Sequence, residues 1–170
     1  GSTEAQVLCD TIANTLTRTA LFTSSQLAKR DGYYPESTDK VLETPFFINH
    51  ANDALVASVE CYGLRNSQLL TIAPTGTLST MLGISGGIEP IFANSYTRMT
   101  KSLHGEDVAY KVYTPIVAEY MEEHGLKDES EFPPWVVTAS DLTVEERIEM
   151  QAVWQDHIDA SISSTVNLPE

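Results

Sequence analysis

The segment Pro74-Thr75-Gly76-Thr77-Leu78-Ser79 combines one glycine with three small hydroxyl side chains, directly after a short apolar run. A phosphate group needs several N–H donors that point inward and no bulky side chain in the way. A glycine turn at the start of a helix supplies both, and hydroxyl groups add donors. These six residues are therefore a candidate phosphate-binding loop. An ordinary strand-to-helix turn capped by threonine uses the same residue types, and the spacing alone favours that simpler interpretation.

A second glycine-containing segment, Gly86-Gly87-Ile88-Glu89-Pro90, could bring backbone and a carboxylate to a ligand. Taken alone, it is better explained as a tight loop in which Glu89 caps or pairs locally. Neither segment contains the lysine of a P-loop, and the sequence has no GxGxxG motif. A Walker-type or dinucleotide-type site is therefore not supported.

The remaining chemistry-bearing residues predict neither a metal site nor a catalytic residue. The four histidines share no metal-ligand spacing, and the two cysteines form neither a CxxC motif nor a cluster with histidine. Cys61 lies near the predicted C-terminal end of a helix, where the dipole raises a thiol pKa, so a structural role is favoured. We expect Asp156, His157 and Asp159 to form a solvated polar face.

The charge of the chain disfavours a nucleic-acid partner. The 170 residues include 24 acidic and 10 basic ones, giving a formal net charge of −14, and such a surface repels phosphate backbones. No apolar run approaches the length of a membrane span. Two unpaired thiols and no signal peptide favour a cytoplasmic protein. Gly1-Ser2 resembles the remnant of a cleaved expression tag, so we expect residues 3–170 to form a single domain and the chain to be an excerpt of a longer protein.

The elements that must position these loops can be read from periodicity and capping. A long helix is expected from Thr3 to Gly32, either continuous or broken near 19–24. It begins with a capping box of Thr3 and Gln6 and has one buried face. That face consists of Leu8, Ile12, Leu16, Ala20 and Leu27. An irregular connection over 33–47 is followed by a second helix, which Gly63 ends.

The second half of the chain predicts short strands and two more helices. We expect a buried strand at 69–73, a strand at 91–100 and a short terminal strand at 163–169. Thr114-Pro115 is typical of a helix start, and that helix runs to Gly125. An acidic surface connection covers 126–141. Thr143 and Glu146 then form a second capping box, which opens a helix with Ile148, Ala152 and Ile158 on its buried face.

Three stretches of this sequence resemble the large catalytic subunit of ribonucleotide reductase, in the order found in that family. They are LAKRDGYYP at 27–35, GLRNSQLLTIAPTGTLSTMLGISGGIEPIFANSYTR at 63–98, and WQDHIDASISSTVNLP at 154–169. The APTGT and SGGIEPIF forms are most similar to the adenosylcobalamin-dependent branch. The resemblance implies an α/β fold: a fragment of a ten-stranded α/β barrel, in which helices pack on a few short strands.

The resemblance also assigns a role to the candidate loops. In the family, the loop that matches Pro74, Thr75, Gly76, Thr77, Leu78 and Ser79 binds the phosphates of the ribonucleotide substrate, and this outweighs the simpler interpretation. The segment that matches Gly87, Ile88, Glu89 and Pro90 shapes that pocket, without a chemical role for Glu89. The radical cysteine, its finger loop and the reducing cysteine pair lie upstream of the matched part. Cys9 and Cys61 match none of them, so no catalytic residue is assigned.

The sequence therefore predicts part of an oxidoreductase that converts ribonucleotides to deoxyribonucleotides. Its parent would use adenosylcobalamin, with no cofactor bound to this part and no turnover by the isolated chain. Expected partners are the substrate, the remainder of the barrel and a second copy, because open strand edges invite self-association. One alternative is a non-catalytic nucleotide-binding or interaction module on the same scaffold, which a natural start near Thr3 would favour. A regulatory or assembly domain built on the acidic surface rests on charge alone.

Overall fold

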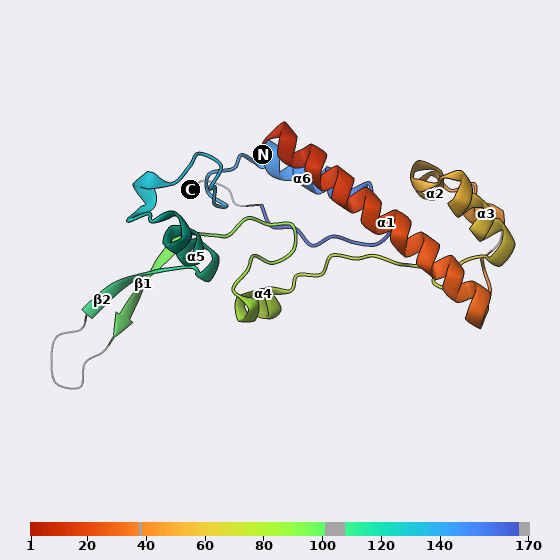
Figure 1. Cartoon of the computed structure of the whole chain (residues 1–170), viewed down its shortest axis with the longest axis horizontal. Coiled ribbons are helices and arrows are strands. Elements are labelled where there is room, and N and C mark those ends of the chain that lie inside the picture. The colour runs from red at the N-terminus through yellow and green to blue at the C-terminus, as the bar shows by residue number, and fades with distance from the viewer. Residues whose placement is uncertain (38, 101–107, 167–170) are drawn as a thin grey trace. The chain divides into compact units, whose positions relative to one another are not determined.

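The computed structural model describes residues 1–37, 39–100 and 108–166, and the described chain divides into two compact units. The first unit contains Gly1–Ala73 and Glu145–Ser163, and the second contains Pro74–Val144 together with the residues from Ser164 onward. Both units mix helices with extended segments (Figure 1). None of the helices in these ranges combines the length and the apolar character that crossing a bilayer demands.

The first unit is built on one long helix, α1 (Thr3–Asp31), which runs without the break considered near 19–24. Gly32 ends it at φ 84°, as predicted. The predicted capping box is wrong: Ser2 is the N-cap, and its hydroxyl accepts a hydrogen bond from the Ala5 amide at 3.2 Å. The Gln6 side chain instead donates to Glu149 at 2.9 Å.

The buried face of α1 is not the predicted one. Leu8, Ile12 and Leu16 are 60%, 49% and 46% exposed. The opposite face is buried and consists mainly of small residues: Ala13, Thr17, Leu21, Ser24, Ser25 and Ala28. Small side chains let neighbouring segments approach the helix closely and hydrogen-bond to it. Ser25, for example, shares a hydrogen bond of 2.9 Å with Ser58.

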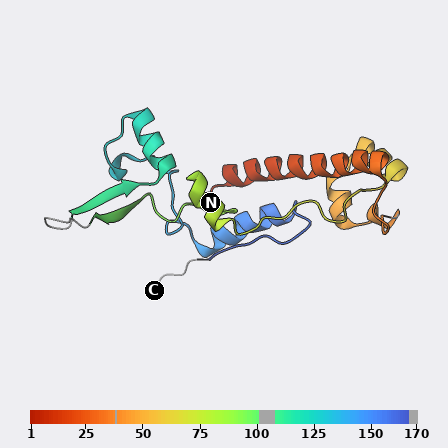
Figure 2. The ribbon, with the colours of Figure 1, turned by 90° about the horizontal axis from the view of Figure 1, so that it is seen from below.

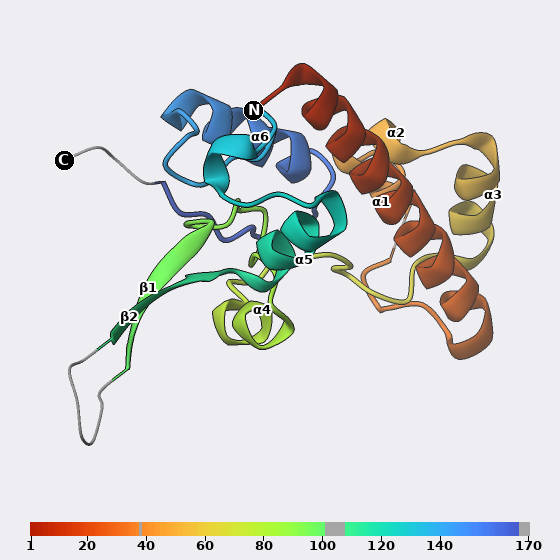
Figure 3. The same cartoon turned by 60° about the vertical axis from the view of Figure 1, so that its left-hand side comes forward.

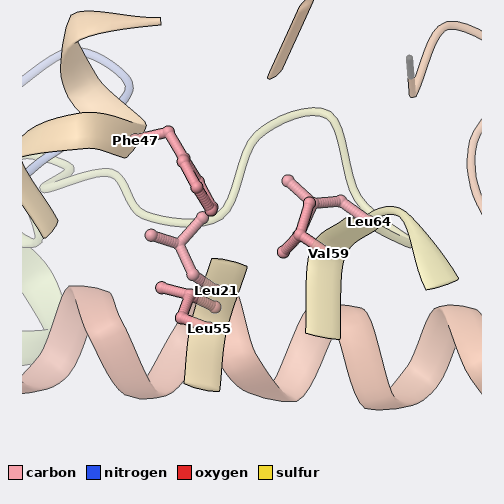
Figure 4. Close-up of a cluster of buried hydrophobic side chains, with 5 residues drawn as sticks. All are labelled: Leu21, Phe47, Leu55, Val59 and Leu64. Atoms are coloured by element: carbon pink, nitrogen blue, oxygen red, sulfur yellow. The ribbon is translucent and has the colours of Figure 1, made fainter. Parts of the chain in front are cut away.

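Two shorter helices, α2 (Pro45–His50) and α3 (Asp53–Tyr62), pack against α1 (Figure 3). The helix α3 is the predicted second helix, and Gly63 ends it. The connection at 33–47 is less irregular than expected, because it contains the 3-10 turn η1 (Asp39–Val41) and the start of α2. Between these elements lies the apolar core of the unit (Figure 4), formed by Leu21, Phe47, Leu55, Val59 and Leu64.

The predicted strand at 69–73 is reduced to one parallel bridge between Ile72 and Ile162, and none of its residues is fully buried. The helix α6 (Val144–Gln155) lies before Ile162 in the sequence. Its predicted face is also wrong in part: Ile148 is 56% exposed, whereas Ile158, beyond the helix end, is 3% exposed. Of the predicted terminal strand, 163–166 form no strand and 167–169 lie outside the described residues.

The second unit contains the short helix α4 (Gly76–Leu82), an antiparallel hairpin and the helix α5 (Pro115–His124) (Figure 2). The hairpin pairs β1 (Ser95–Thr100) with β2 (Val108–Tyr113), from Ser95 opposite Tyr113 to Thr100 opposite Val108. The sequence analysis placed β1 within a longer strand and missed β2. The segment at 126–141 contains the 3-10 turn η2 (Glu129–Glu131) and is otherwise a connection, as predicted. The described residues thus show a mixed helix and strand architecture with one two-stranded sheet.

Candidate functional site

The predicted phosphate loop leads directly into α4, in the order of turn and helix that the sequence indicated. Thr75 is the N-cap of this helix and adopts the left-handed conformation, with φ 44° and ψ 22°. A β-branched residue seldom adopts this conformation. The backbone strain costs on the order of 1–3 kcal/mol, and residues strained in this way cluster at ligand sites. Two hydrogen bonds hold this strained turn in place. The Thr75 carbonyl accepts from the Ser79 amide, and the Thr75 hydroxyl accepts from the Gly87 amide.

The backbone donors of α4 fall into two groups. The Ser79 amide donates to the Thr75 carbonyl at 2.8 Å and is therefore used within the helix. The amides of Gly76, Thr77 and Leu78 belong to the first turn, which has no intrahelical acceptor. No acceptor for these three is found within 1–37, 39–100 or 108–166. Three successive amides thus remain available for an anion.

The second glycine segment packs closely on the first. The Gly87 amide donates to the Thr75 hydroxyl at 3.3 Å, and the Ile84 amide donates to the Ser79 carbonyl at 3.0 Å. A Cβ atom at Gly86 would lie 3.0 Å from the Ser79 hydroxyl and 3.3 Å from the Pro74 carbonyl oxygen. A glycine at position 86 is therefore what lets the two loops touch. Gly87 itself has φ 58°, a conformation that favours glycine.

Both loops line a hollow of about 510 Å³ within the second unit. Its wall includes five of the predicted site residues: Pro74, Gly76, Ser79, Glu89 and Pro90. The other five, Thr75, Thr77, Leu78, Gly87 and Ile88, are not part of the wall. No lysine or arginine among the described residues lines this hollow, so an anion there would depend on amides and hydroxyls.

The wall also contains residues that the sequence analysis did not single out for the site, among them Thr114, Ser95 and Tyr96. Thr114 lies directly before α5, and its hydroxyl is buried without a partner in the described part of the chain. Ser95 and Tyr96, at the start of β1, also line the hollow. Ser95 donates to Glu129 at 2.7 Å. The sequence can indicate that Thr114 begins a helix. It cannot indicate that Thr114 lines the hollow, because that depends on contacts with residues far away in the sequence.

Glu89 has a structural partner, since its carboxylate accepts a hydrogen bond from the Thr165 amide at 2.7 Å. This partner lies 76 residues away in the sequence, so the expectation that Glu89 caps or pairs locally is wrong. The expected solvated face at 156–159 is wrong in part: Asp156 is exposed, but His157 is 8% exposed. Asp159 is half-buried and accepts from the Leu69 and Leu70 amides, each at 2.8 Å.

The cysteines are unpaired, and the described residues form no cluster that could hold a metal ion. Cys9 is half-buried, Cys61 is exposed, and both are free thiols. The described residues contain no group of three or more histidine, cysteine, aspartate or glutamate side chains that could hold a metal ion.

Comparison with known proteins gives the family. The model of the ribonucleotide reductase barrel domain matches residues 1–170, so the chain belongs to the ribonucleotide reductase family. This confirms the resemblance drawn from the three sequence stretches.

Individual relatives agree with this family. A vitamin B12-dependent ribonucleoside-diphosphate reductase of Mycobacterium tuberculosis is 33% identical over 121 residues, which are 62% of this chain and 17% of the relative. Its counterpart of the same name in Thermoplasma acidophilum is 32% identical, over 62% of this chain and 16% of the relative. A ribonucleoside-diphosphate reductase large subunit of Variola virus is 30% identical over 74% of this chain and 17% of the relative. The chain thus spans about a sixth of the length of these proteins.

Proposed function

We propose that this chain is the portion of a ribonucleotide reductase catalytic subunit that holds the phosphates of the ribonucleotide substrate. The observation that carries the proposal is the row of three unbonded amides at Gly76, Thr77 and Leu78, at the start of a helix beside a hollow. A helix start favours negative charge because its amides and its dipole both point at the ligand. The chain's net charge of −14 makes such a local site necessary for binding a nucleotide.

Three structural features support this proposal. The strained Thr75 turn is fixed by the Gly87 amide, so the loop is preorganised before a ligand arrives. The Thr77 hydroxyl lies in the first turn, where it can add a donor. The unpartnered Thr114 hydroxyl in the wall supplies one more polar group for the ligand. Gly87, Ile88, Glu89 and Pro90 shape the pocket through their packing on the first loop.

The parent enzyme, in this proposal, reduces ribonucleotides with the aid of adenosylcobalamin, as the names of the two B12-dependent relatives suggest. When bound, that cofactor initiates the radical chemistry. A hollow of about 510 Å³ is of the size that holds a drug-sized ligand, and a corrin is far larger. The residues of this site therefore do not fit the cofactor, and we derive no step through it. The residues of this chain bind and orient the substrate.

The proposal is tested with the 170-residue chain and a nucleoside diphosphate, by recording amide shifts up to millimolar ligand. We expect the Gly76, Thr77 and Leu78 amides to shift together in a saturable way. The first-turn amides of α3, Asp53 and Ala54, are the matched control, because they open an ordinary helix capped by Asn52. Equal responses of both helices, or none at α4, would refute a dedicated phosphate site.

A second test concerns turnover. The described thiols, Cys9 and Cys61, lie outside the candidate site, and neither loop contains a cysteine. We expect no deoxyribonucleotide from the isolated chain with adenosylcobalamin and a dithiol reductant. Product formation under these conditions would show that the site contains a catalytic group that we have not assigned.

A further inference from the structure

Two buried histidines, 107 residues apart in the sequence, meet inside the first unit. His50 is the last residue of α2 and is 2% exposed, and His157 follows α6 and is 8% exposed. The Nε2 atom of His50 lies 2.8 Å from the Nδ1 atom of His157, and the two rings meet edge to face. This distance is that of a hydrogen bond between two imidazoles.

The outer nitrogen of each ring also has a partner. His50 Nδ1 lies 2.6 Å from the Phe46 carbonyl oxygen, and His157 Nε2 lies 2.9 Å from Oδ1 of Asp10. A carbonyl oxygen and a carboxylate only accept hydrogen bonds. The Asp10 side chain is 59% exposed and thus stands in contact with water. Each outer nitrogen must therefore carry a proton.

These contacts fix the number of protons. Three hydrogen bonds, one to Phe46, one between the rings and one to Asp10, need three N–H donors. Two neutral imidazoles hold only two protons, one on each ring. With both outer nitrogens protonated, the two inner nitrogens would face each other with bare lone pairs at 2.8 Å. A third proton between them removes this repulsion.

We propose that His50 and His157 form a buried proton-binding site, in which the two rings share three protons and one positive charge that Asp10 neutralises. The site ties together three elements of the first unit: α1 through Asp10, α2 through His50, and the end of α6 through His157. The Thr17 hydroxyl adds a further tie, since it donates to the His157 carbonyl at 2.5 Å. Loss of the third proton breaks the central contact.

Among the described residues, the surroundings supply no second counter-charge. On α2, the Phe46 and His50 rings are tilted against each other, with centroids 4.7 Å apart. Next to His157, Asp156 is exposed, and Asp159 is already bonded to two backbone amides. Asp10 is therefore the acidic group that bonds directly to the pair.

The direct test uses the unsubstituted 170-residue chain and long-range proton–nitrogen spectra of its histidine rings near pH 7. We expect His50 Nδ1 and His157 Nε2 both to be protonated, and the two inner nitrogens to share one proton. A pair with only two protons, leaving any one of the three contacts without a proton, would overturn the proposal. This readout requires no variant.

Variants supply an independent measure. We expect His50→Gln to speed amide exchange at the end of α2 and after α6 at pH 7, because the contact between the two rings is lost. His124→Gln is the control, because His124 is exposed and bonds within its own helix, to the Tyr120 carbonyl. Asp10→Asn keeps the acceptor oxygen but removes the charge, so it should also speed exchange there. Unchanged exchange in both His50→Gln and Asp10→Asn would contradict a shared, charged proton.

Discussion

The two units of the chain differ in where their apolar side chains lie. In the first unit, apolar residues from α1, α2 and α3 bury one another in a single cluster. In the second, burial is confined to a few positions such as Val117 and Met121, while Phe92 and Trp135 are 74% and 66% exposed. The candidate site belongs to this second, more weakly packed unit. Ligand-binding loops are generally drawn from the parts of a fold that open most easily.

The largest expected effect is on the core of the first unit. Phe47 is 2% exposed and touches the centre of the apolar cluster, so Phe47→Ala should cost about 3–5 kcal/mol of unfolding free energy. Phe92→Ala removes the same side chain from a position 74% exposed and should change stability by less than about 0.5 kcal/mol. Urea unfolding followed by amide exchange in each unit measures both.

If the two substitutions cost the same, the contrast between the units does not exist in solution. A large loss for Phe92→Ala would mean that this ring is covered in solution, for example by a second copy. Repeating the measurement over a range of protein concentrations separates these outcomes.

The parts of the fold that the sequence predicted are those fixed by local chemistry. Gly63 and Gly125 end helices at positive φ, and Pro115 opens α5, because these residues act on their own backbone. The buried face of α1 could not be predicted in this way. Leu8 and Ile12 are more apolar than Thr17 and Ser24, and only the positions of distant partners decide which face packs.

The same distinction applies to the candidate site. The free amides at Gly76 and Thr77 follow from the order of a turn and a helix, which the sequence shows. The contact between Thr75 and Gly87, and the place of Thr114 in the wall, depend on how segments fold back on each other. The strand predicted at 69–73 fails for this reason too, since a strand needs partners along its whole length.

The second prediction concerns Asp159, which holds residues 69–73, where a strand was predicted, through two hydrogen bonds. Its two carboxylate oxygens accept from the Leu69 and Leu70 amides, so Asp159→Asn places an amide group against one backbone N–H. Such a loss costs about 1–3 kcal/mol. We expect faster amide exchange at Leu69 and Leu70, whereas Asp156→Asn, at an exposed neighbouring position, should leave it unchanged. Equal exchange in both variants would show that the carboxylate does not fix this segment.

The third prediction changes the site without touching its donors. Gly86→Ala places a methyl group 3.0 Å from the Ser79 hydroxyl and so pushes the two loops apart. Overpacking of this kind costs about 1–3 kcal/mol. If about 1.4 kcal/mol of this cost destabilises the nucleotide-bound form relative to the free form, the affinity for nucleotide drops about tenfold. Ser85→Ala, which adds no atom, is the control. Unchanged affinity in Gly86→Ala would mean that the second loop does not shape the pocket.

The smallest effect, which sharpens the contrast between the units most, is the response of the hairpin to acid. The Lys111 ammonium, 2.8 Å away, and the Ser95 hydroxyl hold the pKa of the Glu129 carboxyl below its ordinary value. A carboxyl whose folded pKa is lowered contributes stability above its unfolded pKa, about 4.3, and loses it as the pH falls through the folded value. Acid therefore loosens the link from β1 and β2 to η2.

Glu129→Gln should remove this acid response, with only a small loss of stability at neutral pH because both partners are more than a third exposed. Amide exchange of Tyr96 and Val112, which face each other in the hairpin, measures it from pH 6 to pH 3. Glu122→Gln, at an exposed position on α5, is the control. If the hairpin of Glu129→Gln still loosens in acid as the unsubstituted chain does, then Glu129 is not the group responsible. The acid response of the second unit would then come from other carboxyls whose pKa is lowered. Asp128 and Asp141 are such carboxyls, since they accept hydrogen bonds from Ser130 and Thr138.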